Sequence, residues 1–142
     1  MKGFLVDTNV ISEARRRGRG NRAVINWIAA HQDELYLSVL VTGEIRRGIE
    51  SIRKRDPRAA ASLERWLREI ETSFEDRILP VDGAVADRWG RLMADGTLPA
   101  IDGLLAATAL VHGLTLATRN VRDVVRSAVS SIDPFTAGSG SS

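Results

Sequence analysis

The chain has 142 residues, of which 44% are hydrophobic and 27% charged, and its formal net charge is +2. These values are ordinary for a soluble globular protein with one domain and a buried core. No apolar run is long enough to cross a bilayer and no signal-peptide pattern precedes Asp7, so we expect a cytoplasmic protein without membrane contact. The absence of cysteine excludes disulfides and thiolate metal sites, and His31 and His112 match no zinc spacing. Any metal would be a hard cation held by oxygen ligands.

The first predicted element is a short strand over residues 4–6, whose apolar run is typical of a strand buried on both faces. Asp7 ends this run, and Thr8 and Asn9 favour a turn or a helix cap. Open parallel sheets bind their ligands at the carboxyl ends of their strands, which favours a functional role for Asp7. The alternative is that Asp7 caps the helix predicted over residues 10–17.

Arginine is unevenly distributed along the chain, in one early group and one central group. The two groups are Arg15, Arg16, Arg17, Arg19 and Arg22, and then Arg46, Arg47, Arg53, Lys54, Arg55 and Arg58. Arginine suits bidentate phosphate contact, so two basic patches beside an acidic site would fit a nucleic-acid substrate. The alternative is an ordinary solvated helix surface.

A second strand is predicted over residues 35–37, followed by a helix over residues 39–53 with one apolar stripe. Glu44 lies in the second turn of this helix, near the end of the strand, where it is either a solvated side chain or a site acid. The Asp-Pro pair at residues 56–57 breaks the helix, and a second apolar stripe predicts another helix over residues 63–74. We expect the two helices to form an antiparallel hairpin.

A third strand is predicted over residues 77–81, and Asp82 after it is interpreted as a helix cap. Asp102 lies at the start of an alanine-rich helix predicted over residues 104–112. Two interpretations compete for Asp102: a helix cap, or a metal ligand that faces the same pocket as Asp7. Both can hold at once, because a carboxylate has several lone pairs.

A fourth strand is predicted over residues 114–117, and a polar stretch, residues 118–123, follows it directly. Residues 132–135 are predicted as a final edge strand. The tail, residues 137–142, is of low complexity and is interpreted as a flexible linker or expression remnant. The domain is therefore expected to span residues 1–136.

Short apolar strands thus alternate with helices, which predicts an α/β fold with three layers, α/β/α, around a central, mostly parallel sheet of short strands. Four acids, Asp7, Glu44, Asp102 and Asp123, follow strand ends or lie near helix starts. We expect them to meet in one pocket. Four such carboxylates would repel one another at neutral pH, so the pocket requires a cation or retained protons.

Four short motifs occur in order along the chain. They are Leu-Val-Asp-Thr-Asn-Val-Ile-Ser at 5–12, Glu-Ile-Arg-Arg-Gly at 44–48, Ile-Asp-Gly-Leu-Leu-Ala-Ala-Thr at 101–108 and Ala-Thr-Arg-Asn-Val-Arg-Asp at 117–123. Together they resemble the PIN-domain nucleases, and more closely the VapC/FitB toxins of bacterial toxin–antitoxin pairs. The resemblance implies a Mg²⁺-dependent endoribonuclease, with Mn²⁺ as the alternative ion. The implied partners are RNA, a cognate VapB/FitA-type antitoxin and a second copy of the chain in a homodimer.

The resemblance also implies the site residues. By position, Asp7, Glu44 and Asp102 match the main acidic ligands, and Asp123 matches a fourth acid that falls at the position of Asn120 in some relatives. We expect Asp7 and Asp102 to bind the ion directly, with Glu44 and Asp123 holding its waters or a second ion. The supporting polar positions of the family are matched by Thr8, Asn9, Thr118 and Asn120.

Two other classes of function compete with this one. A catalytically inactive PIN-fold module would keep the fold and bind RNA or protein, although the retention of all four acids argues against it. A receiver or an aspartyl phosphatase also has an Asp after its first strand. A phosphatase of the haloacid dehalogenase type would have an acid where this chain has Asn9, and a receiver needs a late lysine, whereas lysine occurs only at Lys2 and Lys54.

Overall fold

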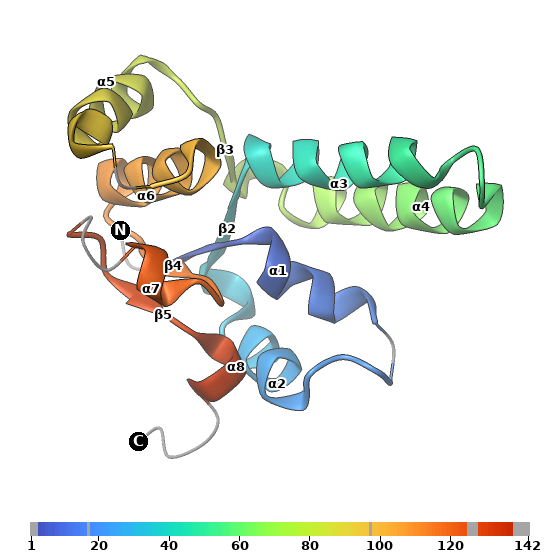
Figure 1. The fold of residues 1–142 in the computed structure, drawn as a ribbon. Helices are drawn as coiled ribbons and strands as arrows, with labels where there is room; N and C mark the ends of the chain where they lie inside the picture. Colours follow the sequence, from blue (N-terminus) through green and yellow to red (C-terminus); the bar gives the residue numbers. More distant parts are fainter. Residues whose placement is uncertain (1–2, 17, 97, 125–127, 138–142) are drawn as a thin grey trace.

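The computed structural model describes residues 3–16, 18–96, 98–124 and 128–137, without the side chains of residues 95, 123 and 137. These residues form one five-stranded sheet with helices on both faces (Figure 1). The strands are β1 (Phe4–Val6), β2 (Leu35–Ser38), β3 (Ile78–Leu79), β4 (Thr115–Ala117) and β5 (Ser131–Ile132). Their order is β3-β2-β1-β4-β5 and every pairing is parallel, so the predicted α/β fold is confirmed.

The helices lie in layers above and below this sheet, and one pair projects from it (Figure 1). The α-helices are α1 (Thr8–Ile11), α2 (Arg22–Ala30), α3 (Val39–Ile52), α4 (Pro57–Ser73), α5 (Gly83–Leu92), α6 (Ala100–His112), α7 (Val121–Val124) and α8 (Pro134–Ala137). Short 3₁₀ turns are η1 (Ser12–Arg15), η2 (Gln32–Glu34), η3 (Glu75–Arg77) and η4 (Met93–Asp95). Helices α5 and α6 lie on one side of the sheet, and α2 and α8 on the other. None of the described helices is long and apolar enough to cross a membrane.

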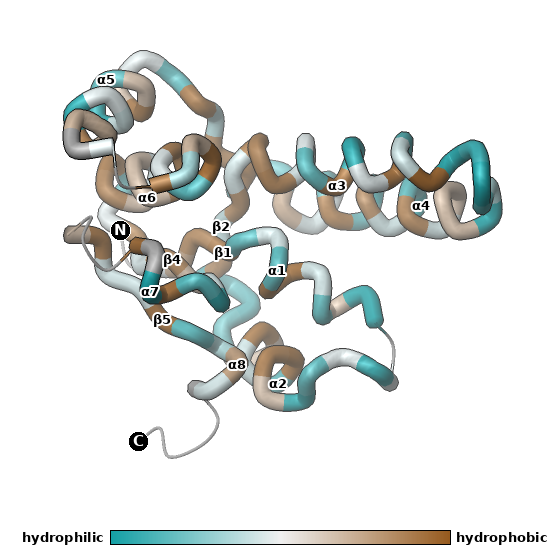
Figure 2. Tube along the Cα trace, viewed as in Figure 1, coloured by the Kyte–Doolittle hydropathy of each residue, from teal (hydrophilic) through white to brown (hydrophobic). Residues whose placement is uncertain are grey.

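The core is built around β1, which lies between β2 and β4. Leu5 and Val6 are completely buried, as the apolar run predicts. Helix α6 covers the sheet with small buried side chains, among them Ala106 and Ala109, which let helix and sheet lie close together. Figure 2 shows hydrophobic residues along the strands and α6, and hydrophilic residues toward the far end of the α3–α4 pair.

The segment after Asp7 differs from the prediction. In place of one helix over residues 10–17, α1 begins at Thr8 and passes into η1, while Arg17 lies outside the described residues. Helix α1 begins early because the Asp7 carboxylate accepts the backbone N–H of Thr8 at 2.7 Å, so the cap interpretation of Asp7 is confirmed. The chain then turns back where the Glu13 carboxylate accepts the backbone N–H of Asn21.

Other boundaries also differ, and α4 begins at Pro57 rather than at residue 63. The third strand is shorter than predicted, with only β3 at residues 78–79. Helix α6 begins at Ala100, with Pro99 at the N-cap position, so Asp102 lies in the first turn and its cap interpretation is wrong. The last strand ends at Ile132, because Pro134 starts α8 and the Asp133 carboxylate accepts the backbone N–H of Phe135. Of the predicted tail, residues 138–142 lie outside the described residues.

Helices α3 and α4 form the predicted hairpin and extend from the sheet as an arm (Figure 1). The Ser38 hydroxyl caps α3 by accepting the backbone N–H of Leu40 at 3.0 Å. The Asp56 carboxylate caps α4 at Ala59, and Pro57 occupies the first turn. The start of each helix of the arm is therefore determined by residues next to it in the sequence.

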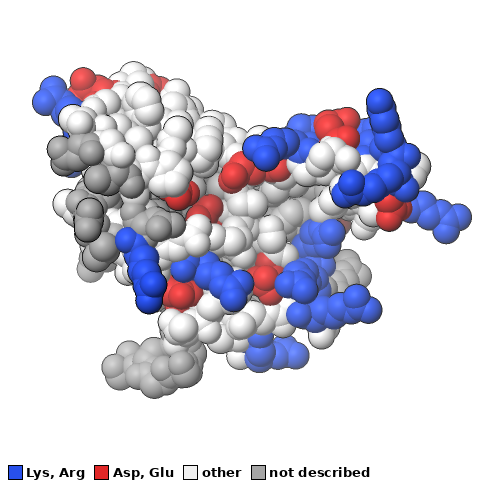
Figure 3. All heavy atoms as spheres, viewed as in Figure 1, with Lys and Arg blue, Asp and Glu red and all other residues white. Residues whose placement is uncertain are grey.

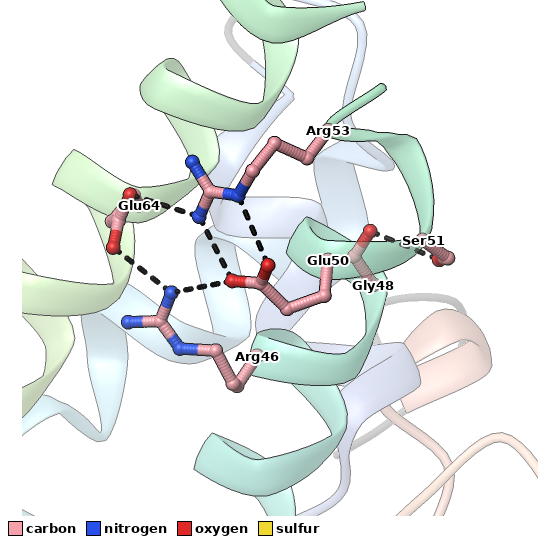
Figure 4. A network of polar contacts seen from close by, with 6 residues as sticks. All are labelled: Arg46, Gly48, Glu50, Ser51, Arg53 and Glu64. Atoms are coloured by element: carbon pink, nitrogen blue, oxygen red, sulfur yellow. Dashed lines mark hydrogen bonds and ion pairs between the residues drawn. The ribbon is translucent and has the colours of Figure 1, made fainter. Parts of the chain in front are cut away.

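Four charged side chains join the two helices on the exposed side of the arm (Figure 4). A guanidinium nitrogen of Arg46 lies 3.2 Å from a carboxylate oxygen of Glu50 and 2.9 Å from one of Glu64. A guanidinium nitrogen of Arg53 lies 2.8 Å from a carboxylate oxygen of Glu50 and 3.2 Å from one of Glu64. The charges of these two central arginines are thus compensated within the arm. For these two residues this agrees with the interpretation as a solvated helix surface.

This network predicts a pH-dependent contribution to stability. Hydrogen bonding from Arg53, and then from Arg46, lowers the pKa of Glu50 from 4.5 to about 2. Because the folded-state pKa lies below the unfolded value, the stabilisation is present above about pH 4.5 and is lost as the pH falls toward 2. We expect Glu50→Gln to lower the melting temperature slightly at pH 7 in low salt, since the pair is exposed.

Calorimetric melts across this pH range measure the difference in melting temperature between Glu50→Gln and the unchanged chain. It should shrink toward pH 2 and in about 1 M salt. A difference that stays constant across pH and salt would mean that Glu50 acts through packing rather than charge.

Candidate active site

Asp7 extends from the carboxyl end of the central strand β1. Its backbone N–H donates to the Ala117 carbonyl oxygen at 2.9 Å, which continues the pairing of β1 with β4. The side chain is buried, with 7% of its surface exposed. One carboxylate oxygen, Oδ1, accepts the Thr8 backbone N–H, and the other, Oδ2, accepts the Thr118 hydroxyl at 2.8 Å. Asp7 therefore caps α1 and remains part of a polar cluster at the sheet edge.

Glu44 reaches the same cluster from α3. The Thr8 hydroxyl donates to Glu44 Oε1 at 2.5 Å, although the two residues are 36 positions apart in the chain. Thr8 thus contacts both acids, through its backbone N–H to Asp7 and its hydroxyl to Glu44. The structure brings together these two predicted site acids.

Burial and charge both act on Asp7. Desolvation raises the pKa of its carboxyl above the ordinary value of 3.8, and the nearby negative charge of Glu44 raises it further. The hydrogen bonds from Thr118 and Thr8 act in the opposite direction and only partly offset the rise. The pair is therefore a place where a bound cation would relieve electrostatic strain.

The predicted supporting residues lie around Asp7. The Asn9 amide donates to Asp7 Oδ2 at 3.4 Å, and its carbonyl oxygen accepts the backbone N–H of Arg119 at 3.2 Å. The Thr118 hydroxyl also accepts the backbone N–H of Asn120 at 3.0 Å. Residues 118–120 are thus tied to the start of α1, and Asn120 takes part through its backbone.

The other two predicted acids are placed differently. Asp102 lies in the first turn of α6 and is partly exposed. Within the described part of the chain, no three His, Cys, Asp or Glu side chains lie close enough to hold one ion, so Asp102 does not join Asp7 and Glu44 in such a group. Asp123 belongs to α7, but its side chain lies outside the described residues.

A cavity of about 370 Å³ opens beside Glu44. Thr8 and Glu44 line it together with Arg15, Arg16 and Trp66. Figure 3 shows Lys and Arg side chains across this face, from the side of α7 to that of η1, and acidic side chains where α6, α1 and α3 meet. Part of the early arginine group therefore borders the acidic site, whereas Arg46 and Arg53 of the central group pair with acids.

Glu13 is a buried acid that the sequence analysis did not single out. Its carboxylate accepts the backbone N–H of Asn21 at 2.7 Å and lies 3.4 Å from Arg16. An acid among arginines looks like a solvated helix surface in the sequence. The one available signal was the loop at residues 18–20, which needs a partner for its backbone groups.

The family model for the PIN domain matches residues 4–126. The chain belongs to the PIN-domain family. It is 32% identical to the VapC ribonuclease Y4jK of Sinorhizobium fredii, over 93% of this chain and 97% of that protein. It is also 32% identical to Toxin FitB of Neisseria gonorrhoeae, over 93% and 98%. The crystal structure of FitAcB from the same organism superposes with a TM-score of 0.73 at 30% identity, over 93% of this chain and 98% of that one.

The hydrogen bond from Thr118 to Asp7 predicts a stability change in this PIN domain. Thr118→Val keeps the shape of the side chain but leaves the buried carboxylate and the Asn120 N–H each without one partner. We expect the free energy of unfolding to fall by about 1–3 kcal/mol, as measured by urea denaturation at pH 7. Thr118→Ser keeps the hydroxyl and should lose less. Equal losses would mean that the methyl group contributes as much as the hydroxyl, and an unchanged stability of Thr118→Val would contradict the role assigned to the hydrogen bond.

Proposed function

We propose that this PIN domain is an endoribonuclease that hydrolyses RNA phosphodiester bonds with a divalent cation held at Asp7 and Glu44. The observation that carries the proposal is the joining of these two carboxylates through Thr8. The names of the relatives, a VapC ribonuclease and a toxin, support it. The arginine-lined cavity beside the acids supports a polyanionic substrate.

The residues present fit Mg²⁺ or Mn²⁺. The donors are carboxylate, hydroxyl and amide oxygens, which hard cations prefer. Asp7 Oδ1 accepts only one hydrogen bond from the described residues and so keeps a lone pair for a ligand. Mg²⁺ is commonly held by one or two carboxylates and keeps several waters, so the Asp7–Glu44 pair suffices as its protein anchor. We assign Asp102 and Asp123 to the outer part of this site, where they would hold the waters of the ion.

The chain's own side chains orient and position the reacting groups. A bound cation supplies Lewis acidity, which eases deprotonation of an attacking water and offsets charge that develops on the phosphate. Thr118 holds the Asp7 carboxylate, and Thr8 holds the Glu44 carboxylate, in fixed orientations. Arg15 contacts the RNA backbone from the cavity without reading its sequence.

We also propose that the chain acts as a toxin, forms a homodimer and is held inactive by a cognate antitoxin. The support is its similarity to Toxin FitB over nearly the whole length of both chains. An antitoxin could inhibit it by inserting a cationic side chain between Asp7 and Glu44, where the charge of that side chain would replace the metal.

The first test is RNA cleavage by the purified chain with Mg²⁺ or Mn²⁺, with EDTA, and with Asp7→Asn. We expect metal-dependent cleavage that EDTA abolishes and that Asp7→Asn lowers by at least about 100-fold. The matched control is Asp82→Asn. Asp82 also follows a strand, but within the described residues its carboxylate acts as the cap of α5 by accepting the Val85 N–H, and asparagine is an equally good cap.

Loss of activity in both variants would assign the effect to the fold. Full activity of Asp7→Asn would contradict the proposed site. An absence of cleavage with any RNA pool, together with intact RNA binding, would favour the inactive binding module. Among the described residues no third acid forms a metal-binding group with Asp7 and Glu44, and this observation keeps the second candidate.

Metal binding should depend on pH through Asp7. The ion needs the ionised carboxylate, and burial raises the pKa of Asp7. We therefore expect Mn²⁺ affinity, measured by calorimetry, to fall with decreasing pH, starting at a higher pH than for an ordinary aspartate. Thr118→Val should move this fall to still higher pH, because the Thr118 hydrogen bond lowers the pKa of Asp7. A fall that begins only at the pH expected for an ordinary aspartate would contradict the role of Asp7.

A further inference from the structure

Arg119 is held beside the acidic site by contacts at both of its ends. Its backbone N–H donates to the side-chain oxygen Oδ1 of Asn9 at 3.2 Å, and the side-chain amide of Asn9 also donates to Asp7. Its guanidinium carbon lies 4.4 Å from the centroid of the Phe135 ring in α8. The preceding residue, Thr118, donates to Asp7. Arg119 is therefore anchored to the site by its backbone and to a second element by its side chain.

The charge of Arg119 is not compensated within the described residues. No carboxylate among them lies within ion-pair distance of its guanidinium, and none of its side-chain N–H groups donates a hydrogen bond to them. The side chain is exposed. Arg16, from the other basic part of this face, is instead paired with Glu13 at 3.4 Å.

Arg77 provides an internal comparison, because it makes the same kind of ring contact. Its guanidinium carbon lies 5.1 Å from the centroid of the Phe74 ring. However, its N–H groups donate to the backbone carbonyl oxygens of Gln32, Leu35 and Ser73, so Arg77 joins three segments of the fold. The Arg119 guanidinium packs against an aromatic ring in the same way, but it donates to no backbone carbonyl oxygen among the described residues. Its donors remain available to a ligand.

Phosphate is the ligand chemistry that fits this arrangement. A guanidinium presents a planar fork that matches two phosphate oxygens, and an aromatic ring beneath it restricts its movement without using its donors. Asp7 and Glu44 repel an approaching RNA strand, and an arginine whose backbone is anchored beside them through Asn9 helps to offset that repulsion and to hold a phosphate. We propose that Arg119, supported by Phe135, binds a backbone phosphate of the RNA strand that enters the Asp7–Glu44 site. This inference rests on the proposed ribonuclease function.

The test measures binding of fluorescently labelled single-stranded RNA in EDTA, where metal-dependent cleavage is absent. We expect Arg119→Gln to weaken binding about 10-fold and to reduce the slope of log K against log salt by about 0.7. Arg119→Lys should recover part of the affinity, and Phe135→Leu should weaken binding less than Arg119→Gln. The matched control is Arg91→Gln, which removes the same charge from an exposed arginine that pairs with Asp87 on α5. Thermal melts confirm that each variant is folded.

Equal losses in Arg119→Gln and Arg91→Gln would reduce the effect to net charge and overturn the proposal. Unchanged RNA binding in Arg119→Gln would also overturn the proposal, and the ligand of Arg119 would then be an acidic group of a protein partner. An absence of RNA binding in the unchanged chain would overturn it as well. In cleavage assays Arg119→Gln should raise KM more than it lowers kcat. A chain that binds RNA through Arg119 but cuts none would contradict the ribonuclease function alone. A chain that cuts RNA equally well with and without Arg119 would contradict this inference alone.

Discussion

The candidate site depends on the parallel pairing of β1 with β4. Phe4, Leu5 and Val6 pair in register with Thr115, Leu116 and Ala117, and the Asp7 N–H extends the ladder by one more bond. Asp7 and Thr118 are the next residues of the two strands, so the register itself sets the carboxylate beside the hydroxyl. A slip of one residue would turn the side chains of β1 to the opposite faces and separate this pair.

Burial of the strands and burial of Asp7 have opposite effects on the energy of the fold. Leu5 and Val6 stabilise the sheet because they are fully removed from water, whereas the same exclusion of water opposes ionisation of Asp7. Thr8 and Thr118 reduce this penalty by donating hydrogen bonds to the carboxylate, and Glu44 increases it. The result is an acid that is fixed in place, partly satisfied and close to a second negative charge.

The parts of this arrangement that sequence could predict are those encoded by neighbouring residues. A buried run that ends at Asp7, and another that ends before Thr118, locate both residues at the sheet edge because parallel strands end on the same side. The contact between Thr8 and Glu44 depends on how α3 leaves the sheet, which no local pattern specifies. The sequence leaves Asp102 open between a helix cap and a metal ligand, because the first turn of α6 begins at Ala100, after a proline that has no capping side chain and so gives no start signal.

The bond between Thr118 and Asp7 joins residues that are 111 positions apart. On the ribosome, where the chain grows at about 5–20 residues per second, Asp7 emerges several seconds before its partner. Contacts of such long range also form late, because the intervening chain must lose its freedom first. A nascent chain therefore carries the first acid through the synthesis of the intervening residues without the hydroxyl that orients it. The complete polar cluster can exist only after Thr118 has been added to the chain.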